Sequence, residues 1–371
     1  MPPSPARNSL IDAVKGLACA AIVWHHLAFY GPMSDSALPL APHLIAWLYD
    51  YGRMAVQVFL VLGGYLAAAS LAPQGIARFD SATQQIARRF VRLVVPYAVA
   101  LVLALLAAAL VRPWLDNPSV PDEPSLVQLL AHALLLQDIV GEAALSAGVW
   151  YVAIDFQLFV CAIALFATVR RLPGLTAQHA ARLAQALVLL GTAASLWGFN
   201  RQPELDRWFI YFFGAYGLGM LAYWAVSAPR AAPWVVALFI LGGLALLEDF
   251  RGRIALAWVV ALAVVWLLRR PASQPWPVLR PLQGLGQMSY SVFLVHFPVC
   301  LLVNALVSQW WPQEPLLNAL GMCVAFALSL AAGRTLYHRV ERHLPSWTLA
   351  LRWQAGLVGA GLLVAQADSW M

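Results

Sequence analysis

The sequence predicts an all-α protein, a polytopic transmembrane bundle of about 10 to 11 spanning helices. Of its 371 residues, 62% are hydrophobic and only 11% are charged, and the mean hydropathy is +0.72. Soluble domains carry about 25% charged residues, so this chain has less than half of that supply. The same composition excludes an intrinsically disordered chain. We therefore expect the lipid bilayer to be its environment.

Apolar segments of spanning length recur along the whole chain. A spanning helix needs about 20 mostly apolar residues, and Pro-rich or charged stretches separate the candidates. Residues 126–140 have instead the pattern of an amphipathic helix at the membrane interface. Because no internal repeat or second soluble region is visible, we expect one membrane domain over residues 1–371. The predicted spans are 10–30, 51–71, 91–111, 148–168, 183–200, 208–227, 233–248, 253–268, 289–309, 316–333 and, as a possible extra span, 348–367.

Basic residues are distributed unevenly along the predicted topology. With a cytoplasmic N-terminus, most of the 23 Lys and Arg residues fall on the inner side. Positive charge collects on cytoplasmic loops in membrane proteins, so we expect the N-terminus in the cytoplasm. The same rule accounts for the net charge of +6 without a nucleic-acid partner.

The cysteines predict no special chemistry. They lie singly in apolar stretches, without a CxxC pair or any paired spacing, as small buried residues do. We therefore expect neither disulfides nor a metal site. The four positions are Cys19, Cys161, Cys300 and Cys323.

The first span contains ionisable residues, which are costly in lipid and need a partner or a function. Lys15 and His26 are eleven residues apart, about three helical turns, so they share one face of the helix. His25 is rotated by about 100° from His26 and points elsewhere. Helical periodicity thus separates the two adjacent histidines.

The fourth span contains a carboxylate, Asp155, one turn after Tyr151. The span midpoints place Asp155 and His26 at similar depths, on the outer side of the membrane centre. A carboxylate beside an imidazole holds its tautomer and raises its basicity, as a general base requires. We therefore hypothesise that Asp155 supports His26.

Three arginines, Arg88, Arg89 and Arg92, lie beside the third span. Two interpretations are open for them. Guanidinium groups bind phosphate well, but basic residues at an inner helix end also anchor a helix to anionic lipid.

Two further spans carry unusual residues. In the ninth span, His296 lies two residues before Pro298 and serves either a function or an interhelical hydrogen bond. In the second span, Gly63 and Gly64 follow Gln57 and allow close helix packing or the approach of a slender ligand.

Four segments occur in a set order within residues 10–345. They are Lys15 to His26, Gln57 to Leu66, Trp150 to Phe159 (WYVAIDFQLF) and Ser289 to Pro298 (SYSVFLVHFP). Together with the arginine-rich stretch and Glu341, they resemble the acyltransferase-3 family, integral-membrane enzymes that O-acylate carbohydrates and other acceptors. The chain departs from the family pattern at three positions: Lys15 replaces arginine, Gly63 replaces serine and Asp155 replaces glutamate.

The resemblance implies an acyltransferase of the bacterial inner (plasma) membrane. Cytoplasmic acyl-CoA, with acetyl-CoA as the default, would be a co-substrate rather than a bound cofactor, and the acceptor a hydroxyl of a carbohydrate or glycolipid. His26 would be the general base, with Asp155 and Lys15 as the other catalytic residues. Donor binding would fall to Arg88, Arg89, Arg92 and His296, and the substrate pocket to Gln57, Trp150, Tyr151, Gln157, Ser289 and Tyr290.

Other mechanisms and functions remain open. Within acyl transfer, a covalent intermediate on Tyr151 or Tyr290 is an alternative to direct attack. A secondary transporter could use intramembrane His, Asp and Lys as a proton relay, although no repeated half with matching broken helices is visible. A haem or quinone protein and a non-catalytic scaffold explain fewer of the polar residues.

Overall fold

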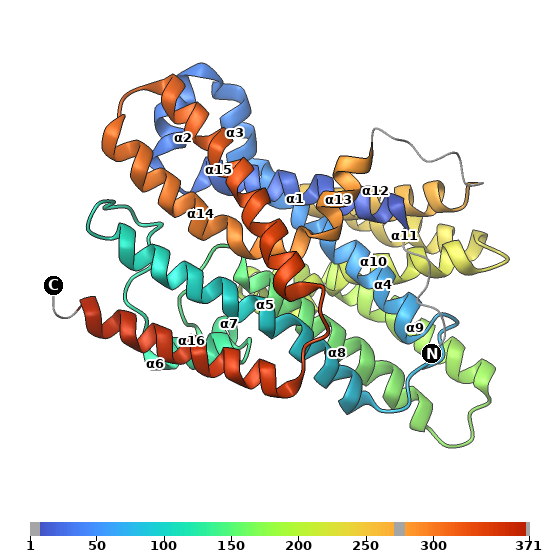
Figure 1. The fold of residues 1–371 in the computed structure, drawn as a ribbon. Coiled ribbons are helices and arrows are strands. Elements are labelled where there is room, and N and C mark those ends of the chain that lie inside the picture. The colour runs from blue at the N-terminus through green and yellow to red at the C-terminus, as the bar shows by residue number, and fades with distance from the viewer. Residues whose placement is uncertain (1–7, 271–278, 369–371) are drawn as a thin grey trace. The chain divides into compact units, whose positions relative to one another are not determined.

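The computed structural model describes residues 8–270 and 279–368 (Figure 1). Most of these residues are helical and none is in a strand, which confirms the all-α class. Two shorter apolar helices, α11 (Ala232–Glu248) and α12 (Gly252–Leu268), match the two short spans expected there. Within this part of the chain, nine longer segments are apolar enough to cross a membrane: Ser9–Phe29, Pro42–Leu71, Ala82–Val111, Val149–Arg171, Ala177–Arg201, Phe209–Ser227, Ser289–Trp310, Pro315–Glu341 and Trp347–Gln366.

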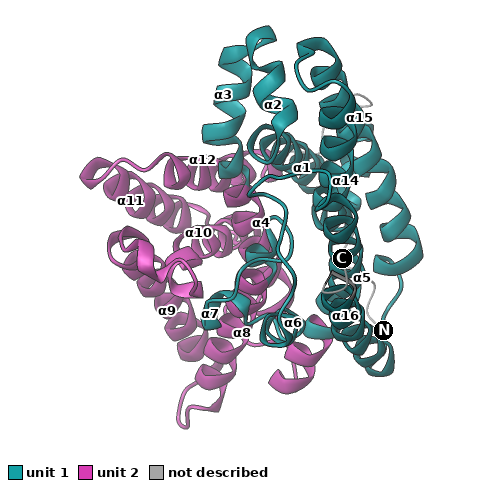
Figure 2. Ribbon diagram, turned by 90° about the vertical axis from the view of Figure 1, so that its left-hand side faces the viewer, with its two compact units in different colours: residues 1–55, 90–152, 277–371 teal, residues 56–89, 153–276 magenta. Residues whose placement is uncertain are grey.

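The chain divides into two compact units, which Figure 2 colours separately. Unit 1 comprises residues 1–55, 90–152 and 277–371, and unit 2 comprises residues 56–89 and 153–276. The division passes through two helices, α5 (Ala82–Val111) and α8 (Val149–Arg171). Each unit is therefore assembled from segments far apart in sequence, and the single domain stays a prediction.

Unit 1 is organised around α1 (Ser9–Phe29), which packs against α13 (Arg280–Gln287) and α14 (Ser289–Trp310). Two glycines bring α1 and α13 into backbone contact. A Cβ added at Gly16 would lie 2.0 Å from the carbonyl oxygen of Leu282, and one at Gly286 would lie 1.7 Å from that of Asp12. The other helices of this unit are α2 (Pro32–Ala37), α3 (Pro42–Tyr51), α6 (Leu126–Ala133), α7 (Gln137–Val140), α15 (Pro315–Leu336) and α16 (Trp347–Asp368).

Unit 2 is organised around α10 (Phe209–Ser227), most of which is buried. This helix contacts α4 (Val56–Leu71), α9 (Ala177–Trp197), α11 and α12. Gly64 of α4 faces the carbonyl oxygen of Tyr216, 1.8 Å from an added Cβ, and Gly219 of α10 faces that of Val61 at 1.9 Å. Small residues allow such close approach of membrane helices.

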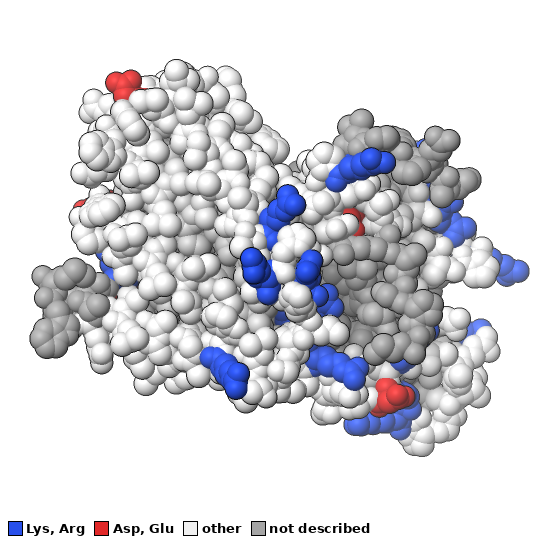
Figure 3. Space-filling view, viewed as in Figure 1, with Lys and Arg blue, Asp and Glu red and all other residues white. Residues whose placement is uncertain are grey.

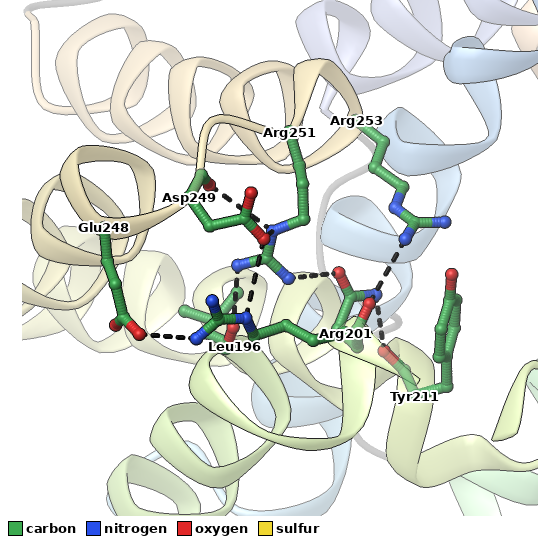
Figure 4. Close-up of polar contacts among 8 residues, drawn as sticks. Leu196, Arg201, Tyr211, Glu248, Asp249, Arg251 and Arg253 are labelled. Carbon is green, nitrogen blue, oxygen red and sulfur yellow. Dashed lines mark hydrogen bonds and ion pairs between the residues drawn. The ribbon is translucent and has the colours of Figure 1, made fainter. Parts of the chain in front are cut away.

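An ion-pair network joins three helix ends of unit 2 (Figure 4). Arg201, after α9, pairs with Glu248 at the end of α11, with 2.5 Å between Nη1 and Oε1. Arg251, just before α12, pairs with Asp249 at 3.3 Å and donates a hydrogen bond to Asn200 Oδ1 at 2.8 Å. The network therefore holds the α11–α12 loop against the end of α9.

The helix α5 starts earlier than its apolar segment predicts. It begins at Ala82 rather than near residue 91, so Arg88, Arg89 and Arg92 lie within the helix, about two to three turns after its start. Gln, Ala and Arg are good helix formers, which explains how a polar stretch extends the helix. On the face drawn in Figure 3, Lys and Arg side chains are more frequent than Asp and Glu side chains.

Candidate functional site

The helix α1 carries the residues from which the site is built. Asn8 caps its first turn by accepting hydrogen bonds from the backbone N–H groups of Leu10 and Ile11. Near its other end, Nδ1 of His25 donates a hydrogen bond to the carbonyl oxygen of Leu48 at 2.9 Å. His25 therefore fastens α1 to α3 and, as helical periodicity predicts, points away from the partner of His26.

His26 and His296 form a buried pair in unit 1. Nδ1 of His26 lies 2.6 Å from Nε2 of His296, and the two rings are nearly parallel, with an interplanar angle of 7°. Nδ1 of His296 in turn lies 2.6 Å from the carbonyl oxygen of Phe293. The partner that orients His26 is thus an imidazole on α14.

The chain of contacts assigns the protons of the two neutral rings. A carbonyl oxygen only accepts, so Nδ1 of His296 carries a proton and its Nε2 is an acceptor. Nδ1 of His26 must then donate to that acceptor, which leaves Nε2 of His26 with a lone pair. This Nε2 makes no hydrogen bond with any described residue. The geometry presents it as a base.

Gly148 brings the start of α8 to this pair. Its φ is +75°, a left-handed conformation that favours glycine. A Cβ there would lie 2.7 Å from Cζ of Phe293 and 3.5 Å from Cε1 of His26. The ring of Tyr151, one turn on, packs edge-on against Phe293 with centroids 5.8 Å apart. Tyr151 therefore lies near the histidine pair, whereas Trp150 is half-buried beside it.

A second polar cluster of unit 1 surrounds Glu341. Its Oε2 accepts hydrogen bonds from the backbone N–H of Ser291 at 3.1 Å and from Oγ of Ser291 at 2.6 Å. Lys15 and Arg92 lie within electrostatic range of the same carboxylate. Lys15 is thus electrostatically coupled to a carboxylate that follows the predicted tenth span by eight residues.

Two of the predicted pocket residues, Ser289 and Tyr290, donate side-chain hydrogen bonds to backbone carbonyl oxygens. Oγ of Ser289 donates a hydrogen bond to the carbonyl oxygen of Gly286 at 3.0 Å. The hydroxyl of Tyr290 donates one to the carbonyl oxygen of Leu93 at 3.0 Å. Both hydroxyls therefore stabilise the start of α14, and their contact with a substrate stays a prediction.

In unit 2, Asp155 forms an ion pair with Arg89. The guanidinium of Arg89 also lies over the ring of Phe159, 5.1 Å from its centroid. The structure therefore brings together one predicted catalytic and one predicted donor-binding residue. The hypothesis that Asp155 supports His26 stays a prediction, and Nδ1 of His26 is already bonded to His296.

The remaining predicted residues differ in exposure. Gln57 is buried in α4, whereas Arg88 and Arg92 are exposed on α5. Gln157 accepts a hydrogen bond from the backbone N–H of Phe209 at 3.1 Å and so secures the start of α10. Among residues 8–270 and 279–368, no group of three or more His, Cys, Asp or Glu side chains is arranged to hold a metal ion.

Sequence reasoning missed two features of this site. His296 was assigned to donor binding, and its pairing with His26 across 270 positions was not foreseen. The available signal was a lone histidine inside an apolar span, which must find a polar partner. Glu341 was noted only through the family resemblance, although its carboxylate contacts Ser291.

Comparison with known families extends these observations to the whole fold. A family model described as an acyltransferase domain, that of the acyltransferase-3 family, matches residues 8–334. No curated protein and no solved structure matches the chain significantly. The matched range includes α1, α5, α8 and α14, the four helices that carry the polar residues described above. The chain therefore belongs to the acyltransferase-3 family and is an integral-membrane acyltransferase.

Proposed function

We propose that the enzyme transfers an acyl group, acetyl as the default, from cytoplasmic acyl-CoA to a hydroxyl group of a carbohydrate or glycolipid at the bacterial inner membrane. The observation that carries this proposal is the His26–His296 pair, which leaves Nε2 of His26 with an unshared lone pair. Family membership favours acyl transfer over the transporter interpretation.

In the proposed reaction, Nε2 of His26 removes the proton of the acceptor hydroxyl as its oxygen attacks the thioester carbonyl. The carbon–sulfur bond breaks, the ester forms, and the CoA thiolate takes the proton back from His26. His296 stabilises the intermediate imidazolium because its Nε2 accepts the hydrogen bond from Nδ1 of His26. No metal or bound cofactor enters this scheme.

Donor binding is assigned to the basic residues of α5. Arg88 and Arg92 are exposed, which supports a role in binding the phosphate groups of acyl-CoA, since guanidinium groups bind phosphate through paired hydrogen bonds. Arg89 is paired with Asp155, so its contribution to donor binding would require exchange of that partner.

The test uses purified enzyme in nanodiscs with radiolabelled acetyl-CoA and longer acyl-CoAs, comparing the wild type with His26→Ala and His25→Ala. We expect wild-type release of CoA, and a loss of at least about 100-fold in His26→Ala, the smaller end of general-base effects. His25→Ala is the matched control, because His25 bonds a backbone carbonyl on α3.

Four outcomes decide the proposal. Normal activity of His26→Ala would remove the base, and equal losses in both variants would contradict the separation of the two histidines. Failure of the wild type to bind or cleave any acyl-CoA would remove the donor. Radiolabel retained on denatured enzyme after incubation without acceptor would replace direct attack by a covalent intermediate, for which Tyr151 and Tyr290 are the first residues to mutate.

A further inference from the structure

Glu341 lies at the end of a π-helical turn, Tyr337–Glu341, that continues α15. This turn follows the range 8–334 that the family model matches. Single π-helical turns are rare and occur frequently at functional sites. The turn places the carboxylate of Glu341 toward α14, where it accepts two hydrogen bonds from Ser291.

The first of these contacts caps a helix from outside. The backbone N–H of Ser291 belongs to the first turn of α14, where N–H groups have no partner within the helix. Met288, at the capping position, offers no side-chain hydrogen bond. Glu341 supplies the missing acceptor, and its negative charge is favourable near the positive end of the helix dipole.

Glu341 is also coupled to two basic residues through electrostatics. Lys15 on α1 and Arg92 on α5 lie within range of the same carboxylate. Glu341 is therefore hydrogen-bonded to α14, which carries His296, and electrostatically coupled to α1, which carries His26, and to α5.

We propose that Glu341 is a positioning residue for acyl transfer: its hydrogen bonds hold the start of α14, and its charge holds the ammonium of Lys15 on the face of α1 that carries His26. The inference rests on the proposed function. The hydrogen bonds of Glu341 and its charge can be tested separately, because an amide at position 341 keeps the hydrogen-bond acceptor and removes the charge.

The experiment is a double-mutant cycle on the intact enzyme in nanodiscs, with Glu341→Gln, Lys15→Met and the double variant. We expect each single variant to lower kcat by about tenfold and to change the KM for acyl-CoA less than about twofold. The double variant should be no worse than the poorer single variant, since residues that act as a unit are not additive. Thermal melting of Glu341→Gln should stay close to that of the wild type.

Two controls separate positioning from a general effect on folding. Glu314→Gln removes an exposed carboxylate at the start of α15 and should retain wild-type kcat. Lys15→Arg keeps the positive charge and should retain most of the activity, whereas Glu341→Ala removes the cap as well and should also lower the melting temperature.

Wild-type kcat in Glu341→Gln, or losses that multiply in the double variant, would overturn the inference. His26→Ala, measured in parallel, reports on the proposed function independently. An inactive His26→Ala together with a fully active Glu341→Gln would leave the base in place and remove only the role of Glu341.

Discussion

At the scale of single residues, buried polar atoms of unit 1 differ in whether they have a partner. Oγ of Ser291 is bonded to Glu341. Oγ of Ser146, Oη of Tyr97 and Oε1 of Gln137 are equally inaccessible but have no hydrogen-bond partner in the part of the chain that the structure describes. A buried polar atom without a partner costs about 1–3 kcal/mol. The unbonded hydroxyl of Ser146 therefore destabilises the fold, whereas the bonded hydroxyl of Ser291 stabilises it.

Removing these two hydroxyls should therefore have opposite effects on stability. Ser146→Ala should raise the free energy of unfolding by up to about 1 kcal/mol, because an unsatisfied hydroxyl is lost. Its melting temperature should therefore rise slightly. Ser291→Ala should lower that free energy by about 1.5–3 kcal/mol, the range for hydrogen bonds to charged groups. Thermal melts in one detergent compare the two directly, and a stabilised Ser291→Ala would contradict the assignment.

A buried histidine outside the spans makes stability depend on pH. Nδ1 of His132 donates to the carbonyl oxygen of Gln128 at 2.8 Å, and its Nε2 accepts from the backbone N–H of Leu145 at 3.2 Å. Desolvation by burial lowers the pKa of His132 from 6.5 to about 4 in the folded protein, against a smaller opposite effect of the Gln128 hydrogen bond. Between these two values the unfolded chain binds more protons.

The contribution of His132 to stability is therefore complete above pH 6.5 and is lost as the pH falls toward 4. Melting temperatures measured across this interval should fall for the wild type. His132→Gln keeps an acceptor within reach of Leu145 and does not titrate, so its melting temperature should fall less steeply. Identical slopes for the two proteins would show that His132 is not the group responsible.

At the scale of helices, adjacent glycines of α4 have unequal surroundings. A Cβ at Gly64 would lie 1.8 Å from the carbonyl oxygen of Tyr216, so the close contact with α10 requires glycine there. A Cβ at Gly63 would lie 3.4 Å from the ring of Tyr216 and 3.7 Å from Oδ1 of Asp155, which are ordinary contact distances. Of the two glycines, Gly63 is thus the one with space for a side chain.

Serine substitution at these two positions forms a matched pair. Gly63→Ser should fold normally, because its Cβ meets no backbone atom and its hydroxyl comes within reach of Asp155. Gly64→Ser should destabilise the fold by about 3 kcal/mol, the upper part of the usual range for overpacking. Detergent melts and expression levels measure the difference, and equal tolerance would mean that α4 and α10 are further apart.

At the scale of the whole molecule, the nine long and two short apolar helices within residues 8–270 and 279–368 give an odd number of crossings if every one of them spans. The short pair α11 and α12 has 17 residues in each helix, about 26 Å of rise. A hydrocarbon core of about 30 Å exceeds this length slightly, and local thinning of the bilayer accommodates such a mismatch. With the N-terminus in the cytoplasm, the end of α16 would lie outside.

Reporter fusions test this topology. Alkaline phosphatase fused after Met371 should be active, because it folds only outside the cytoplasm. The same reporter fused after Pro345, before α16, should be inactive. The reverse pattern would place the N-terminus outside, and two inactive fusions would show that α16 does not cross the membrane.

Much of this architecture follows from local properties of the chain. Transfer of apolar side chains into lipid adds up residue by residue, so hydropathy alone predicted the membrane class and both short helices α11 and α12. Helical phase is equally local, which is why the spacing within α1 separated His25 from His26. The start of α5 was predicted about nine residues too late, because hydropathy reports the apolar part of a helix and not its full length.

The partners of the polar residues depend instead on which helices pack together. His26 meets His296 across 270 positions, and Arg89 meets Asp155 across 66. Neither pair has a signal in the local sequence, because a hydrogen bond inside lipid depends on the register and rotation of two separate helices. Composition and periodicity therefore predicted which residues needed a partner, whereas only tertiary packing decided which partner each one found.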